Sequence, residues 1–323
     1  MGSSKATNQR SNSIASLVRY AVLAPSSHNT QPWRFEVADT SLRLYADRMR
    51  SLPANDPDDR ELTISCGCAL MNLRVAAARA GLRPSCRILP NAADADLLAM
   101  VDLNGAPPAA SPEAGLFWCL EKRRTYRQQF ESRPVPSAAL DDLARCAAQE
   151  GAWFHVIDAE EDRRRAAALV AEGDALQWSN RQWRRELAAW MRPRRRGDGL
   201  TVNGVLAPLV KLIIRTFDMG SRMAEKDRQL TQEAPVVTAL GTQGDEAADW
   251  VRAGQALQRV LLLGHSKGLQ GSFLNQPVQV ASLRSRLRRL LKRAGSPQIL
   301  LRLGFPRGKL PPTPRRALTA VID

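Results

Sequence analysis

The sequence lacks the features that would place it in a membrane or outside the cell. It has no apolar run near the roughly 20 residues that a membrane-spanning helix needs, so we expect no membrane span. The polar N-terminus, MGSSKATNQRSNS, has no apolar signal-peptide core, and residues 1–12 are interpreted as a flexible leader. Five cysteines are an odd number for a disulfide framework, which makes the cytoplasm the expected location.

Metal-ligand spacing and acidic residues are also scarce. Cys66 and Cys68 form a C-x-C pair rather than the C-x-x-C of a zinc knuckle, and the three histidines are scattered. We interpret both thiols as buried and free. Only 32 acidic residues oppose 47 basic ones, and the net charge of +15 attracts phosphates, nucleic acid or acidic lipid without distinguishing among them.

The chain length and the hydrophobic content suffice for one large domain or two smaller ones. The chain has 323 residues, and 44% of them are hydrophobic. Apolar spacing predicts a helix over 14–23, a hairpin over 33–47, a long helix over 61–82 and two strands over 85–105. A helix, a basic turn, a second helix from Ser137 and a strand then follow.

Two helical segments resemble each other. Residues 66–82 and 253–269 both carry G-x-A-L near the start and G-L at the end, with the same spacing from Gly67 to Gly81 as from Gly254 to Gly268. This internal repeat predicts two related halves with pseudo-twofold symmetry. We place them at residues 13–105 and 116–323, separated by a linker over 106–115 that is rich in Pro and Ala.

The second half contains a long basic stretch over about 160–232. The pattern predicts mostly helix, broken by Pro193 and by the two glycines of the segment RRRGDGL. We interpret this stretch as an insertion, and a lid over a site is one interpretation of its role.

Three clusters are candidates for binding a ligand. The first is APSSHNTQPWRF, in which Pro25 and Pro32 stiffen a loop that is rich in hydroxyl and amide groups. Such a loop can outline a planar ligand, or it can be a tight connector with capped turns. The second cluster is RRTYRQQF and the third is a Pro-rich tail that ends in two arginines. Guanidinium groups bind phosphate. Alone, the second cluster is equally consistent with a solvated helix end, and the tail is a weak signal because basic C-terminal segments are usually solvated.

Together these clusters resemble the FMN-dependent nitroreductase family. The matching pieces are APSSHNTQPWRF, RRTYRQQF, AGQALQRVLLLGHSKGL and RLGFP with PPTPRRAL. The order of the first two is inverted relative to ordinary members, and each half keeps a motif that the other half has lost. The chain therefore resembles a subgroup in which two subunits are fused into one chain.

The resemblance implies an α+β fold with a mostly antiparallel central sheet, helices on both faces and a pseudo-dimeric build. It implies one FMN per chain, NAD(P)H as electron donor and a nitroaromatic, quinone-like or related acceptor. No protein nucleophile is required, since the flavin carries the chemistry. Arg123 and Thr125 are expected at the FMN phosphate, with Arg315 or Arg316 reaching it from the tail, and Arg127 is expected near the pyrimidine side of the flavin. The full set of expected cofactor contacts is Pro25, Ser26, Ser27, Asn29, Gln31, Arg123, Arg124, Thr125, Arg127, Leu274, Asn275, Gln276, Arg315 and Arg316.

Other interpretations remain open at this level. A flavin-storing protein without catalysis is one, with the insertion closing over the cofactor. A nucleic-acid-binding protein is another interpretation. The net positive charge is not accompanied by a known nucleic-acid-recognition motif, so we expect no nucleic-acid partner. The basic segment over 282–295 is interpreted as a surface helix with its leucines packed inward. GHSKG matches G-x-S-x-G but follows a helix rather than a strand, so no hydrolase site is expected. Whether two chains associate further is left open.

Overall fold

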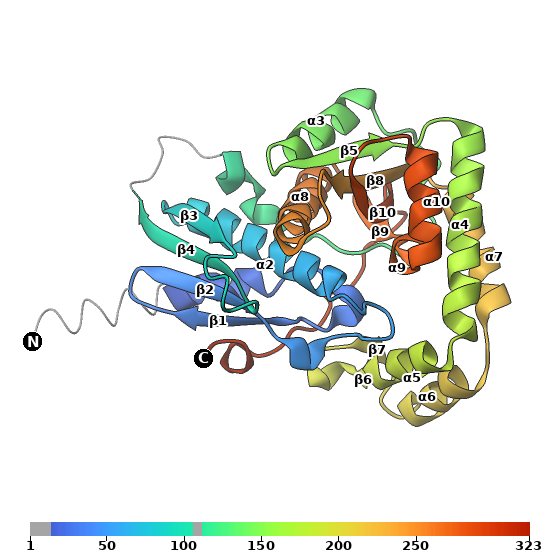
Figure 1. The fold of residues 1–323 in the computed structure, drawn as a ribbon, viewed down its shortest axis with the longest axis horizontal. Helices are drawn as coiled ribbons and strands as arrows, with labels where there is room; N and C mark the ends of the chain where they lie inside the picture. The colour runs from blue at the N-terminus through green and yellow to red at the C-terminus, as the bar shows by residue number, and fades with distance from the viewer. Residues whose placement is uncertain (1–13, 106–111) are drawn as a thin grey trace, which may run out of the picture.

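The computed structural model describes residues 14–105 and 112–323. Their strands form two four-stranded antiparallel sheets and a small parallel pair, surrounded by helices (Figure 1). The α+β class is confirmed. The expected antiparallel sheet is divided into two four-stranded sheets, one in each half of the chain. The predicted leader, and residues 106–111 of the predicted linker, lie outside the described residues.

The first sheet consists of β1 (Trp33–Val37), β2 (Ser41–Ala46), β3 (Arg83–Ile88) and β4 (Leu97–Gly105). Their order across the sheet is β1-β2-β4-β3. The predicted hairpin is confirmed, with Phe35 opposite Leu44 in its register. Along β2 the burial alternates as the sequence pattern predicts, since Leu42 and Leu44 are buried and Arg43 is exposed.

The second sheet repeats this arrangement. It consists of β5 (Ala152–Val156), β8 (Val236–Thr242), β9 (Gln270–Phe273) and β10 (Ser296–Gly304), in the order β5-β8-β10-β9. In both sheets the strands therefore lie in the order first, second, fourth, third along their half. A 20-residue helix connects the second strand to the third in each case.

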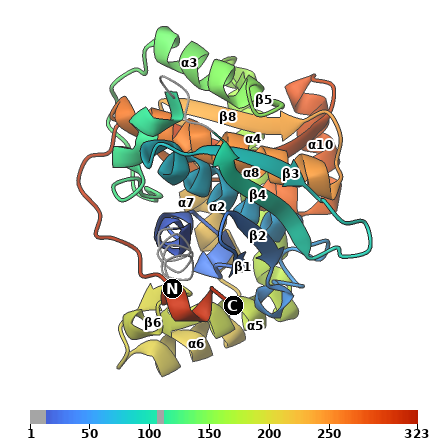
Figure 2. The same ribbon diagram turned by 90° about the vertical axis from the view of Figure 1, so that its left-hand side faces the viewer.

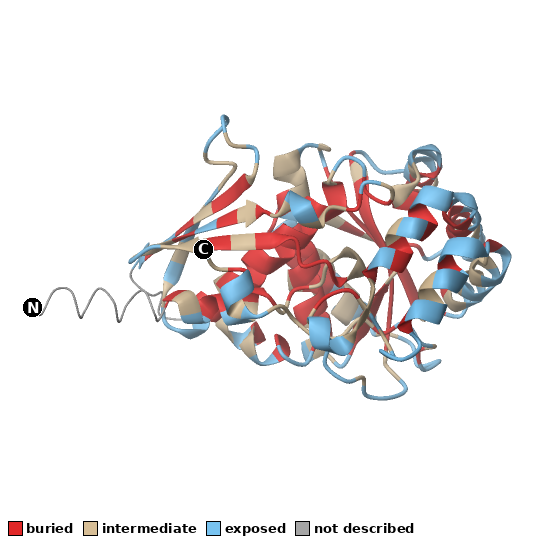
Figure 3. Cartoon of the chain, turned by 90° about the horizontal axis from the view of Figure 1, so that it is seen from below, coloured by how far each residue is buried: buried red, intermediate tan, exposed pale blue. Residues whose placement is uncertain are grey.

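Those two helices, α2 (Arg60–Arg79) and α8 (Ala247–Ser266), pack against each other in the centre of the molecule (Figure 1). The centre of the molecule in Figure 3 is largely buried. A Cβ at Gly67 would lie 2.3 Å from the carbonyl oxygen of Val251, and one at Gly254 would lie 2.1 Å from that of Ile64. The backbones therefore touch where the two matched glycines of the repeat meet. Each helix is followed by the other matched glycine, Gly81 or Gly268, at positive φ.

The insertion lies between β5 and β8, where the first half has only residues 38–40 between β1 and β2. It is mostly helical, as predicted. Its elements are α4 (Glu160–Ser179), α5 (Arg181–Trp190), β6 (Met191–Pro193), η4 (Arg194–Arg196), β7 (Leu200–Val202), α6 (Ala207–Thr216) and α7 (Gly220–Gln232). In Figures 1 and 2 its α6 lies at the opposite end of the molecule from α3 (Ser137–Ala148).

The remaining elements complete the two halves. Residues 14–21 are helical. Short elements are η1 (Ser27–Asn29), η2 (Arg48–Arg50), η3 (Pro112–Cys119), α9 (Gln276–Gln279), α10 (Ala281–Leu291) and η5 (Leu318–Ala320). The helix expected after residue 115 is instead the 3-10 segment η3. In α10, Leu283, Leu287 and Leu291 are buried, which confirms that this basic helix packs its leucines inward.

The C-terminal segment connects the two halves. From β10 it returns to the first sheet, where Phe35 N–H donates to the carbonyl of Val321 and Asp323 N–H donates to the carbonyl of Phe35 (Figure 1). The basic segment after η3 lies beside β9, because Tyr126 N–H donates to the carbonyl of Gly271. These two crossings position the arginine clusters of the second half near the loop of the first half. None of the helices in the described ranges is long and apolar enough to cross a membrane.

Candidate functional site

A cavity of about 740 Å³ lies where the two halves, the insertion and the C-terminal tail meet. Its lining comes from the loop 25–29, from α2, from the segment 123–127, from the start of α9 and from the tail 311–315. The insertion contributes residues of α4, α5 and α7. The structure thus brings together motifs that lie far apart in the sequence.

The loop 25–29 is held in an unusual conformation. His28, Asn29 and Gln31 all have φ near +50°, a region that residues other than glycine seldom adopt. The hydroxyl of Ser26 accepts from Gln31 N–H at 3.0 Å and closes the turn. The Asn29 amide donates to the carbonyls of Gly199 and Pro314 and accepts from Arg315. The insertion and the tail therefore fix the loop against the cavity.

His28 adds a neutral imidazole to this loop. Its Nδ1 is buried and has no hydrogen-bond partner among the described residues. Burial and, to a smaller extent, the nearby charge of Arg127 lower the pKa of His28 to about 4. The ring is therefore uncharged at neutral pH and presents an open nitrogen near the cavity, which His28 lines.

A basic wall, which we define as Arg123, Arg127, Arg302 and Arg315, also lines the cavity. Arg123 is 4% exposed, and its Nε and Nη1 have no partner in the described part of the chain. Nε of Arg302 and Nε of Arg315 are likewise buried without a partner there. Buried guanidinium donors without acceptors are costly, and an anion placed in the cavity would satisfy them.

The electrostatics of the wall support the same interpretation. Burial lowers the pKa of Arg123 to about 10, that of Arg302 to about 10 and that of Arg315 to about 9. The pKa of Arg315 is lowered further by the charges of Arg123 and Arg124. All remain protonated at pH 7, so the wall concentrates positive charge that a phosphate would neutralise.

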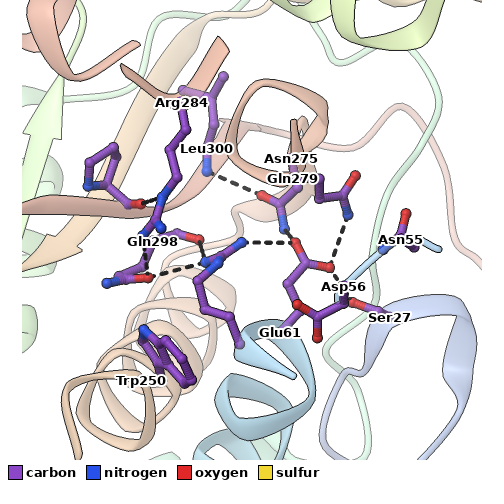
Figure 4. A network of polar contacts seen from close by, with 12 residues as sticks. Ser27, Asn55, Asp56, Glu61, Trp250, Asn275, Gln279, Arg284, Gln298 and Leu300 are labelled. Carbon is purple, nitrogen blue, oxygen red and sulfur yellow. Dashed lines mark hydrogen bonds and ion pairs between the residues drawn. The ribbon is translucent and has the colours of Figure 1, made fainter. Parts of the chain in front are cut away.

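Glu61, near the start of α2, joins the two halves across the floor of the cavity. It is 2% exposed and accepts hydrogen bonds from the Ser27 hydroxyl at 2.6 Å, the Asn275 amide at 2.8 Å and the Gln279 amide at 2.9 Å (Figure 4). Asn275 in turn accepts from Leu300 N–H of β10. This network ties the loop of the first half to the β9–α9 segment of the second half.

Comparison with known proteins identifies the family. The family model described as "Nitroreductase family" matches residues 120–305, which is more than half of the chain. A Mycobacterium tuberculosis protein whose name assigns it NAD(P)H nitroreductase activity by inference is 32% identical over 321 residues, covering 96% of this chain and 91% of the relative. The chain belongs to the nitroreductase family. This confirms the family resemblance found in the sequence.

Other relatives are more distant. A second M. tuberculosis protein, named only as uncharacterized, is 27% identical over 320 residues and covers 96% of this chain and 92% of its own. A crystal structure of the FMN-dependent nitroreductase NfnB from Mycobacterium smegmatis in complex with NADPH is 17% identical. It covers 62% of this chain and 94% of its own, with a TM-score of 0.42.

In this nitroreductase-family chain, most of the predicted contact residues border the cavity. They are Pro25, Ser26, Ser27, Asn29, Arg123, Thr125, Arg127, Leu274, Asn275, Gln276 and Arg315. Residues of the cavity that the sequence analysis missed as contacts include His28, Glu61, Arg302, Asp174 and Asp227. Glu61 had a detectable signal, since it is a carboxylate at the start of a helix that is otherwise strongly apolar.

Three predicted contacts, Gln31, Arg124 and Arg316, are not among the residues that line the cavity. Gln31 is fully buried and donates to the carbonyl of Gly197 at 2.8 Å. Its side-chain oxygen accepts from Arg316 N–H, and the Arg316 guanidinium donates back to the Gln31 carbonyl. The Arg124 guanidinium donates to the carbonyl of Arg123. The buried Nε of Arg124 has no partner in the described part of the chain. Gln31 and Arg316 are occupied by the protein itself, so they support the cavity rather than border it.

Proposed function

We propose that this chain is an NAD(P)H-dependent flavin oxidoreductase that binds one FMN and reduces a nitroaromatic, quinone-like or related acceptor. The basic wall is the observation that carries the proposal. Its buried, unpartnered guanidinium donors fit the phosphate of FMN, and the cavity of about 740 Å³ is within the size range of cofactor sites. The names of the relatives, which assign NAD(P)H nitroreductase activity, support the same conclusion.

Each part of the cavity has a role in this proposal. Arg123, Thr125 and Arg315 hold the phosphate, and a charge-assisted hydrogen bond of this kind contributes roughly 1.5–3 kcal/mol. Arg127 stabilises negative charge on the pyrimidine side of the flavin. The remaining proposed contacts are Pro25, Ser26, Ser27 and Asn29 from the first half and Leu274, Asn275 and Gln276 from the second. The bound FMN would take a hydride from the nicotinamide and deliver the electrons to the acceptor.

Gln31, Arg124 and Arg316 act as supports in this proposal. Gln31 and Arg316 clamp the tail to the loop 25–29, so that Arg315 is presented to the cavity. Arg124 N–H donates to the side chain of Gln270 at the start of β9, which positions the backbone next to Arg123.

We also propose that the chain arose by duplication, with halves at 13–105 and 116–323 and an insertion at about 160–232. The shared strand order and the equivalent positions of the four repeat glycines support this proposal. A cytoplasmic location is proposed because all five cysteines are free, including the buried Cys66 and Cys68.

Anaerobic reduction of the FMN-loaded protein tests the function. NADPH or NADH is added to the purified holoprotein, and the flavin absorbance is followed in the absence of oxygen. We expect at least one nucleotide to bleach the flavin, and a nitroaromatic or a quinone to restore the oxidised spectrum. If dithionite bleaches the flavin and neither nucleotide does, the chain stores flavin instead of catalysing electron transfer, with the insertion excluding the donor.

A further inference from the structure

Two carboxylates of the insertion face the cavity from neighbouring helices. Asp174 lies on α4 and Asp227 on α7, and both line the cavity. The Nε2 of Gln276, at the start of α9, donates to Asp174 at 3.1 Å and to Asp227 at 3.0 Å. One amide group thus holds both carboxylates, and it holds them close to each other.

The close packing of Gln276 is built into the backbone. A Cβ at Gly173, next to Asp174, would lie 2.6 Å from the Cβ of Gln276. Glycine at this position lets α9 approach α4 closely enough for the Gln276 amide to reach both carboxylates. The backbone packing of α4 and α9 therefore fixes the positions of the two carboxylates, which are not simply neighbouring surface residues.

Neither carboxylate is neutralised. Asp174 is 5% exposed, and its Oδ2 has no hydrogen-bond partner among the described residues. Neither carboxylate has an ion-pair partner within 4.0 Å in the described ranges. The charged groups that act on Asp227 are Asp174, Lys226, Arg302 and Arg127.

This environment favours the protonated form of the pair. Burial and, to a smaller extent, the charge of Asp227 raise the pKa of Asp174 to about 7, against the hydrogen bond from Gln276. Burial also raises the pKa of Asp227, against Gln276 and the positive charges of Lys226, Arg302 and Arg127. Because the two carboxylates interact, the uptake and release of a proton is a property of the pair.

We propose that Asp174 and Asp227 form a proton-donating site that delivers a proton to an oxygen atom of the electron acceptor. The inference rests on the proposed function and assigns the acceptor class: two-electron acceptors, such as quinones, that take up a proton on oxygen when they are reduced. A general acid needs a pKa near the working pH and a position beside the substrate, and Asp174 lines the cavity with a pKa of about 7.

The step balances in electrons and protons. A quinone accepts a hydride from the reduced cofactor, which brings two electrons and one proton. A second proton leaves the Asp174 carboxyl and forms the other O–H bond of the hydroquinone. The carboxylate that remains takes a proton from solvent before the next turnover.

The other titratable groups of the cavity are poorer donors. His28 is neutral at pH 7, because burial and Arg127 lower its pKa to about 4. Glu61 accepts from Ser27, Asn275 and Gln279, so its oxygens are already occupied by donors. The acid pair of the insertion is the group whose protonation matches the task.

Rapid mixing of reduced holoprotein with two acceptors tests this inference. The FMN-loaded protein is reduced by light and EDTA, so the experiment does not depend on NAD(P)H. It is then mixed anaerobically with menadione, which takes up protons, or with ferricyanide, which takes one electron and no proton. Asp174→Asn is compared with wild type and with Glu161→Gln, a matched change of an exposed acid on the same helix.

We expect Asp174→Asn to slow menadione reduction by at least about tenfold while ferricyanide reduction stays within about twofold of wild type. The wild-type menadione rate should fall as pH rises through about 7, and this fall should be absent in the variant. Asp227→Asn should reproduce the effect in a weaker form, which covers the case in which the first variant does not fold.

Two results would overturn the inference: unchanged menadione kinetics in both variants, or equal slowing with both acceptors. The outcomes for the two proposals are distinguishable. If NAD(P)H does not reduce the flavin but the light-reduced protein shows the expected contrast, the result contradicts NAD(P)H as electron donor and supports the proton-donating site. A chain that does not bind FMN would sink both.

Discussion

The cavity carries basic and acidic groups that come from different parts of the chain. The basic wall consists of arginines from the segment 123–127, from β10 and from the tail, and it remains charged at neutral pH. The acid pair consists of Asp174 and Asp227 from the insertion, and its charge changes near neutral pH. The difference suggests a division of labour, in which the wall holds an anionic cofactor and the acid pair acts on the acceptor.

The two groups also differ in how they are supported. Arg315 of the wall donates to the carbonyls of Leu23 and Ala24 and to Asn29, so its position is fixed by the first half. Asp174 is fixed through Gln276 and leaves one oxygen unpartnered in the described part of the molecule. A charge in a fixed position suits cofactor binding, whereas a carboxyl group that titrates near the working pH suits proton transfer.

Removing the central charge of the wall should have the largest effect. Arg123→Gln should weaken FMN binding by about 10- to 150-fold, the equivalent of one charge-assisted contact of about 1.5–3 kcal/mol. Titration of apoprotein with FMN, followed by flavin fluorescence, measures the change. Arg124→Gln is the matched control, because Arg124 is the neighbour of Arg123 but is not among the cavity-lining residues. This variant should change the affinity by less than about threefold. Equal losses in the two variants would contradict the assignment of the wall.

Glu61 contrasts with the acid pair of the insertion. It is also an acidic residue of the cavity, but hydrogen-bond donors occupy its carboxylate oxygens. Glu61→Gln places an amide donor opposite the donors of Asn275 and Gln279, and it should lower the free energy of unfolding by about 1–3 kcal/mol. Urea unfolding followed by circular dichroism measures this. Glu161→Gln, on the exposed face of α4, should stay within about 0.5 kcal/mol of wild type. A stable Glu61→Gln protein would show that the network is not needed to join the halves.

The acid pair should give stability a distinct pH dependence. The pKa of Asp174 is higher in the folded state than its ordinary value of 3.8, so the folded protein binds more protons between about pH 4 and 7. Its contribution to stability is therefore present at low pH and falls as pH rises through this window. Asp174→Asn should abolish roughly 1–2 kcal/mol of this fall, less than the full shift because the carboxylate borders an open cavity. Parallel pH profiles of unfolding free energy in both proteins would contradict the raised pKa.

The smallest effect is expected for a residue that supports the wall from outside the cavity. Arg316→Gln removes the guanidinium bonds to the carbonyls of Gln31 and Trp33, which hold the tail that carries Arg315. FMN affinity should fall by about two- to fivefold, below the effect of Arg123→Gln. The exposed Arg196 of η4 supplies the control, because Arg196→Gln should leave the affinity unchanged within error. An effect of Arg316→Gln as large as that of Arg123→Gln would place Arg316 in direct contact with the cofactor.

The sequence predicted the elements of the fold better than their assembly. The hairpin 33–46, the long helices and the helical insertion follow from local periodicity and turn residues. The separation into two sheets did not follow, because sheet membership depends on hydrogen bonds between distant strands. The crossing of α2 and α8 at Gly67 and Gly254 explains why these glycines recur in both halves.

For the site, the sequence indicated residues that stand in clusters, although it missed His28 within the first cluster, and it missed the residues that stand alone. Arg123, Thr125 and Arg127 form one short motif, so they were visible as a candidate anion site. Asp174 and Asp227 are far apart in sequence and meet only because α4 packs on α7. Arg316 was indistinguishable from Arg315 by composition, and only the hydrogen bonds to Gln31 and Trp33 separate their roles.

The central claim is that the basic wall and the loop 25–29 together hold a single FMN. Calorimetric titration of the full-length apoprotein with FMN tests it most directly. We predict saturation at one FMN per chain. No detectable binding, or saturation at two equivalent FMN per chain, would contradict the account.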